Sequence, residues 1–143
     1  MQFINNKLIF LSALFLFACS AETANSEAEN NQIVLAQIQQ KWDLVAIDGQ
    51  AIDTQISSTL AVASGGKATG NLACNHFFGT LLLQNNRLRI DHMASTRKMC
   101  QSAVNEIELI VSSTLSDWSE VSLKSNKLTL LGKTHSLSYT IEQ

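Results

Sequence analysis

The chain has 143 residues, of which 45% are hydrophobic and 15% charged, and its formal net charge is −2. This length suits one domain, and the apolar fraction excludes a wholly disordered protein. The near-neutral charge excludes bulk binding to nucleic acid, which requires clustered Lys and Arg to neutralise phosphates. The three cysteines leave one odd thiol to explain.

The first 18 residues have the features of a secretory signal. An apolar run over residues 8–18 follows Lys7, and it is shorter than the roughly 20 residues that a membrane-spanning helix needs. The run ends in LFAC, which resembles a bacterial lipobox, so we expect cleavage before Cys19 and lipidation of that residue. A plain signal peptide with Cys19 as a chance residue is the alternative interpretation. Because Ser20 stands where an aspartate would favour inner-membrane retention, we expect a lipid-anchored protein of the cell envelope, at the outer membrane and facing the periplasm.

Residues 19–39 are expected to form the lipidated cysteine and a flexible acidic tether. The segment up to Gln32 is polar and carries Glu22, Glu27 and Glu29 but no large apolar side chain, so it cannot bury a core. An ordinary ragged terminus would look the same. The domain itself is expected over residues 40–143, where acidic and basic residues are equal in number. The sequence therefore predicts no contact with nucleic acid, and a membrane contact through the lipid at Cys19 rather than through surface charge.

The domain is rich in short strand signals. Alternating apolar and polar residues predict strands, in chain order, over 41–48, 59–63, 68–72, 79–84, 87–91, 120–124, 127–131 and 136–141. Turn signals such as Asp48-Gly49 and Asn85-Asn86 separate them. Short strands joined by tight turns predict an antiparallel meander, curled into a small barrel-like sheet.

One segment changes period. Apolar residues from Val104 to Leu115 recur every three to four positions, which predicts an amphipathic helix over about 101–116. Ser102 is the expected N-cap residue. The sequence therefore predicts a mainly β fold with one helix packed on or across the sheet.

Two residue clusters stand out in this pattern. They read GNLACNHFFG over 70–79 and MASTRKMC over 93–100. Together they resemble the paired motifs of the META domain, the HslJ-like family of small bacterial envelope proteins, over residues 41–141. The resemblance implies an antiparallel barrel-like sheet with one helix, frequent lipid anchoring, and a stress-related or heat-shock role at the envelope without a defined activity.

The second and third cysteines lie one in each cluster. In an oxidising compartment the leading interpretation is a disulfide between Cys74 and Cys100, which would join the first motif to the start of the helix. One alternative is a metal site that adds His76 and His92, although the paired ligand spacings of structural zinc sites are missing. The other alternative is a catalytic Cys–His pair, for which nothing in the sequence selects a cysteine.

The other motif residues are candidates for binding or for scaffolding. Asn75 is expected to organise a loop, by side-chain hydrogen bonds or by a positive φ. Phe77 is expected in the core, and Gly79 to permit a bend. Thr96 and Arg97 form either a turn hydroxyl beside a packed arginine stem or an anion site, and the scaffolding interpretation is favoured.

The sequence lacks the common catalytic signatures, among them a G-x-S-x-G elbow, a P-loop and H-E-x-x-H. We therefore expect a non-enzymatic, monomeric envelope lipoprotein with a binding or stress-related role and without a cofactor or metal. Two alternatives stay open. The domain could carry a small hydrophobic ligand inside its barrel, or it could be a protein-interaction or inhibitor module that meets another envelope protein.

Overall fold

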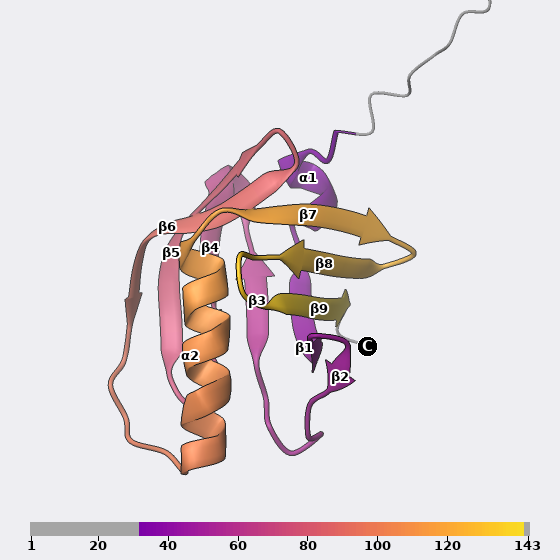
Figure 1. Cartoon of the computed structure of the whole chain (residues 1–143). Coiled ribbons are helices and arrows are strands. Elements are labelled where there is room, and N and C mark those ends of the chain that lie inside the picture. Colours follow the sequence, from indigo (N-terminus) through magenta and orange to yellow (C-terminus); the bar gives the residue numbers. More distant parts are fainter. Residues whose placement is uncertain (1–31, 142–143) are drawn as a thin grey trace, which may run out of the picture. The chain divides into compact units, whose positions relative to one another are not determined.

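The computed structural model describes residues 32–141, so the predicted signal, Cys19 and most of the predicted tether lie outside the described residues. Within residues 32–141, no helix is long and apolar enough to cross a membrane. The elements in chain order are α1 (Leu35–Ile38), β1 (Lys41–Ile47), β2 (Gln50–Ala51), β3 (Thr59–Val62), the 3-10 turn η1 (Ser64–Gly66), β4 (Lys67–Asn71), β5 (His76–Gln84), β6 (Arg87–Ser95), α2 (Ser102–Ser116), β7 (Ser119–Lys124), β8 (Lys127–Leu131) and β9 (Ser136–Ile141) (Figure 1).

The strands form a closed antiparallel barrel. Eight of the nine described strands follow the order β1-β3-β4-β5-β6-β7-β8-β9, and β9 pairs back onto β1. At this seam Trp42 of β1 lies opposite Leu60 of β3 on one side and Ile141 of β9 on the other. The predicted fold class, a mainly β barrel-like meander with one main helix, is thereby confirmed. The two-residue strand β2, which pairs with β1, was not predicted because it is too short to show an alternation.

Two strands are longer than the sequence predicts, and both reach into the motif clusters. β5 begins at His76 and β6 continues to Ser95. Their pairing shifts register between Phe78 and Thr80, and His92 has a φ of 50°, so a bulge interrupts the alternation. This bulge explains why the predicted strand begins too late on β5 and ends too early on β6.

The barrel interior is filled by large side chains. The largest fully buried residues are Trp42, Tyr139, Ile38, Leu60, Leu72, Leu88, Ile90, Leu115, Leu128, Leu130, Leu137 and Val111. They belong to one cluster, to which α2 contributes Val111 and Leu115 from its apolar face. Burial raises the pKa of the Tyr139 phenol, so this side chain is neutral in the core.

The packed part of the chain begins before residue 40, where the sequence analysis placed the start of the domain. Ile38 is 0% exposed, and the indole Nε1 of Trp42 donates to its carbonyl oxygen at 3.0 Å. Further upstream, the backbone N–H of Ile33 donates to Oδ1 of Asn86 at 2.7 Å. The segment from Ile33 onward is therefore part of the domain, because its apolar side chains complete the core.

Candidate functional site

The two motif clusters meet at one end of the helix. A turn after β4 carries Cys74 and Asn75, and residues 96–101 connect β6 to α2. A disulfide joins Cys74 to Cys100 with their Cα atoms 6.0 Å apart, which confirms the predicted pairing. Neither thiol is then available as a metal ligand or nucleophile, so the alternative roles proposed for this pair do not apply to the oxidised protein.

Asn75 is the central side chain of this junction, and it is only 3% exposed. Its Oδ1 accepts from the Thr96 hydroxyl at 2.8 Å and from the Lys98 backbone N–H at 2.6 Å. Its Nδ2 donates to the Lys98 carbonyl at 3.2 Å and to Oε1 of Glu108 at 2.9 Å. One amide side chain thus ties the turn, the loop and the helix together, while the positive φ of this turn belongs to Ala73 at 122°.

Glu108 is the functional residue that sequence reasoning missed. Its Oε2 accepts from the backbone N–H groups of Asn75 at 2.8 Å and Cys74 at 3.2 Å, in addition to the Asn75 amide. The carboxylate thereby joins the helix to the turn that carries Cys74 and Asn75. A glutamate inside an amphipathic helix resembles an ordinary surface residue, so only the tertiary contact reveals its role.

The predicted Thr96–Arg97 pair separates in the structure. Thr96 faces the junction, where its hydroxyl also accepts from the His76 backbone N–H at 3.2 Å. Arg97 is exposed, and within residues 32–141 its guanidinium has no hydrogen bond or ion pair. The structure therefore brings Asn75 and Thr96 together and leaves Arg97 on the surface beside Lys98.

Phe77 and Gly79 belong to the barrel wall. Phe77 points into the core and is buried. A Cβ atom at Gly79 would lie 2.6 Å from Cγ2 of Ile90 and 3.0 Å from the Asp91 carbonyl oxygen. Gly79 thus permits the close approach of β6, and the register shift between Phe78 and Thr80 lies at this residue, where the sequence predicts a bend.

The start of α2 also differs from the prediction. The helix begins at Ser102, and the N-cap position is Gln101, whose side chain makes no capping bond. The loop is instead closed by Asn105. Its Nδ2 donates to the Cys100 carbonyl at 3.0 Å, and its Oδ1 accepts from the Cys100 backbone N–H at 3.3 Å. Ser102 is therefore not the N-cap, because the disulfide loop enters the helix one residue earlier.

A shallow hollow of about 300 Å³ lies over this junction. Its lining residues are Asn75, Ser95, Thr96, Arg97, Lys98, Met99, Asn105, Glu108 and Leu109. Two apolar side chains at its rim are unusually exposed, Met99 at 92% and Leu109 at 69%. An open hollow with basic and apolar residues at its rim suits contact with another molecule better than enclosed chemistry.

His92 and His135 make their polar contacts outside this junction. Nδ1 of His92 is 2.9 Å from Asp91, and Nδ1 of His135 donates to Oδ2 of Asp48 at 2.6 Å. This last bond, with a second from the Ser136 backbone N–H at 2.7 Å, holds the pKa of Asp48 below its usual range. Within the described part of the chain, no three His, Cys, Asp or Glu side chains are placed to hold a metal ion.

Comparison with known proteins places this arrangement in a family. The family model of the META domain matches residues 18–143, which includes both motif clusters and the helix between the strands. The chain belongs to the META domain family. The search of curated proteins returned no match.

Solved structures share the fold of this chain. A protein solved by NMR is 26% identical, with a TM-score of 0.68 over 77% of this chain and 96% of its own. An NMR structure from Burkholderia xenovorans is 20% identical, with a TM-score of 0.62 over 79% of this chain and 91% of its own. A crystal structure of a DUF4847 family protein from Bacteroides vulgatus is 13% identical, with a TM-score of 0.52 over 72% of this chain and 92% of its own. The last two likenesses concern the fold alone.

Proposed function

We propose that this META-domain protein is a non-enzymatic, lipid-anchored protein of the cell envelope, and that its domain binds another envelope protein, in a stress-related role. The observation that carries the binding role is the junction itself. Asn75 and the disulfide hold residues 96–101 from the inside, while the Arg97 and Met99 side chains stay exposed outside. A loop fixed in this way loses little conformational entropy when a partner binds it.

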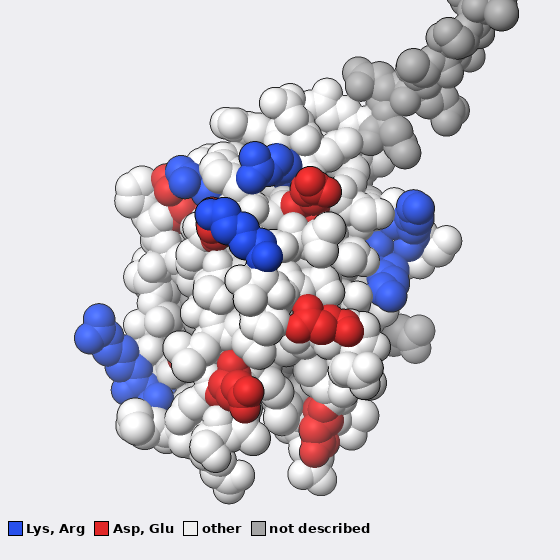
Figure 2. Space-filling model, in the orientation of Figure 1, with Lys and Arg blue, Asp and Glu red and all other residues white. Residues whose placement is uncertain are grey.

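The motif residues support binding rather than catalysis. Cys74 and Cys100 are oxidised, and the Glu108 carboxylate is engaged by backbone donors. Figure 2 shows that basic and acidic side chains are interspersed on the face that carries α2, without a large patch of one sign. Recognition on this face would then depend on shape and a few side chains rather than on net charge.

The filled interior bears on the alternative of a hydrophobic-ligand carrier. Trp42, Tyr139 and Leu60 are fully buried in the barrel. A ligand inside the barrel would have to displace such side chains, at a cost of several kcal/mol. This favours a site on the outer surface, and hence the protein-interaction form of the proposal.

The lipid anchor is tested by metabolic palmitate labelling of the wild type and of Cys19→Ala. We expect label in the wild type and none in Cys19→Ala, which should leave the membrane fraction because its acyl chains are lost. A variant with both Cys74→Ala and Cys100→Ala is the matched control and should keep the label. Equal labelling of the wild type and Cys19→Ala would show that the anchor proposal is wrong.

The binding role is tested by a photo-crosslinking residue placed at Leu109 in the membrane-anchored protein in cells. We expect a discrete protein adduct that weakens when Arg97→Ala and Met99→Ser are added. The same probe at Leu131, an exposed apolar position on β8, is the control. Absence of a discrete adduct at Leu109, or the same adduct at Leu131, would contradict a binding surface at the junction.

A further inference from the structure

A second hollow lies outside β1, away from the motif clusters. β1 pairs with β3 over Lys41–Asp43 and with β2 over Ala46–Ile47, and residues 52–58 between those strands arch away from it. Two hydrogen bonds hold the ends of the arch to β1. Ile52 N donates to the Val45 carbonyl at 3.1 Å, and Leu44 N donates to the Ser58 carbonyl at 2.9 Å. A partly open hollow of about 480 Å³ lies between the arch and β1, within the size range of small-molecule sites.

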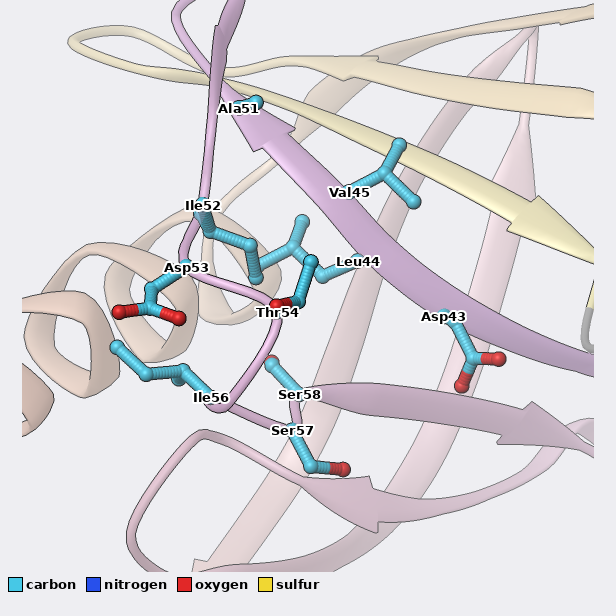
Figure 3. Close-up of a pocket in the computed structure, with 10 residues that line it drawn as sticks. All are labelled: Asp43, Leu44, Val45, Ala51, Ile52, Asp53, Thr54, Ile56, Ser57 and Ser58. Atoms are coloured by element: carbon cyan, nitrogen blue, oxygen red, sulfur yellow. The ribbon is translucent and has the colours of Figure 1, made fainter.

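The lining of this hollow is part apolar and part acidic (Figure 3). Its lining residues are Asp43, Leu44, Val45, Ala51, Ile52, Asp53, Thr54, Ile56, Ser57 and Ser58. Aliphatic side chains come from both walls, with Val45 on β1 and Ile52 on the arch. No lysine or arginine is among the lining residues, so the two carboxylates face no cation within the hollow.

The two carboxylates are not equivalent. Oδ1 of Asp53 already accepts from the Gln55 backbone N–H at 2.9 Å, which stabilises the turn of the arch. Asp43 is half-buried on β1, and its carboxylate has no hydrogen bond or ion pair within residues 32–141. In Figure 3 the Asp43 side chain leaves β1 on the side of Ser57, whereas Asp53 lies at the opposite side of the labelled group. Asp43 is therefore the acceptor that is available to a ligand.

We infer that this hollow binds a primary ammonium group carried on a short aliphatic stem. The ammonium contacts the Asp43 carboxylate, and the stem packs on Val45 and Ile52. A half-buried carboxylate beside apolar walls attracts a cation more strongly than a fully solvated one, because water screens it less. The aliphatic stem then removes apolar surface of both partners from water. This site goes beyond the proposed function, since it uses neither the lipid anchor nor the motif junction.

The inference is tested by titrating the ¹⁵N-labelled protein with pentylamine, which is protonated at pH 7, and with pentan-1-ol, which has a similar stem and no charge. We expect saturable NMR shift changes at the amides of Val45, Ile52 and Ser57 with pentylamine, and at least fivefold weaker binding of pentan-1-ol. Equal binding of pentylamine and pentan-1-ol, or the absence of saturable shifts at these amides, would overturn the inference. This test uses the wild-type protein alone.

Two variants then separate a contact with Asp43 from a general effect of negative charge. Asp43→Asn should weaken pentylamine binding about fivefold, the upper range for a partly exposed ion pair. Asp53→Asn removes the same charge from the other side of the arch and should weaken binding less than twofold. The ¹⁵N spectrum of each free variant reports whether its fold is retained. Equal losses in the two variants would overturn the assignment of Asp43 as the ammonium contact.

Discussion

At the scale of single residues, the junction depends on the complementarity of Asn75 and Glu108. An amide offers both an acceptor and two donors, and Asn75 uses Oδ1 toward the loop and Nδ2 toward both the loop and the helix. An aspartate at this position would bring a second carboxylate against Glu108, and an alanine would leave Lys98 N–H and the Thr96 hydroxyl without their partner. The Asn in the first motif and the Thr in the second are thus two ends of one hydrogen bond.

Asn75→Ala should destabilise the protein by about 3 kcal/mol, because several buried or half-buried polar groups lose their partner at about 1–3 kcal/mol each. Urea unfolding, followed by tryptophan fluorescence, measures this difference. Arg97→Ala changes the exposed neighbour and should stay within about 0.5 kcal/mol of the wild type. A loss in Asn75→Ala no larger than that of Arg97→Ala would contradict the role of this network.

Asp48 provides a pH-dependent prediction. The hydrogen bond from His135, followed by that from the Ser136 N–H, lowers the pKa of Asp48 in the folded state. A carboxylate with a lowered folded-state pKa stabilises the fold above its unfolded-state pKa, near 4, and this contribution is lost as the pH falls through the folded-state value.

We therefore expect Asp48→Asn to be less stable than the wild type at pH 7, and the difference to shrink from about pH 4 downward. Asparagine tolerates the positive φ of 51° at this position, so the substitution removes the charge and keeps the turn. Urea unfolding at a series of pH values measures the difference. A difference that stays constant down to pH 2 would show that the charge of Asp48 does not contribute.

At the scale of the elements, the disulfide couples the barrel to the helix. It closes a loop across a separation of 26 residues, which contains β5 and β6. Since the loop is long, the cross-link restricts the unfolded chain considerably, while Asn75 and Asn105 hold the same loop in the folded state. Covalent and hydrogen-bonded constraints therefore act on one short connection.

Reduction of the disulfide should lower the free energy of unfolding by about 3.5 kcal/mol, from the entropy of closing a loop of this length. Urea unfolding with and without reductant measures the change. Cys19→Ala, which keeps this disulfide, should respond to reductant in the same way as the wild type. Two free thiols by intact mass in the unreduced domain, or unchanged unfolding midpoints, would contradict the prediction.

At the scale of the whole molecule, closure of the barrel depends on both ends of the domain. β9 near the C-terminal end pairs with β1, and the segment before β1 adds Ile38 to the same core. The hydrogen bond from Trp42 Nε1 to the Ile38 carbonyl joins this segment to the closing seam. Pairing between elements far apart in sequence thus joins the described residues 32–141 into one compact unit.

A protein that begins at Gln40 should be about 3 kcal/mol less stable than one that begins at Gln32. The shorter protein loses the burial of Ile38 and leaves the Trp42 indole N–H without its acceptor. Thermal and urea unfolding of the two proteins measure the difference. Identical midpoints would show that residues 32–39 contribute nothing to the fold and that a domain start at residue 40 is adequate.

Most strands were predictable because their residues alternate regularly. In β1, β8 and β9 the apolar side chains on one face of the strand are buried in the core. In α2 the apolar residues at helical spacing mark the buried face of the helix. Prediction was poorer at β2, which has two residues, and at the bulge around His92, where one extra residue shifts the alternation. Local pattern cannot reveal either feature, because both depend on the partner strand.

The sequence alone determined the family, through the two motif clusters, together with the meander of strands and the main helix, and it favoured a disulfide between Cys74 and Cys100 over a metal site or a catalytic cysteine. Only the tertiary structure decided that the Glu108 carboxylate accepts hydrogen bonds from the backbone of the turn that carries Asn75. It also decided that Thr96 contacts the junction while Arg97 is exposed, and that Asp43 lines the hollow beside residues 52–58. The physical reason is one of range. Strand and helix periods arise between near neighbours in the chain, whereas a hydrogen-bond acceptor for a buried amide, or a wall for a hollow, is supplied by a segment far away in the sequence.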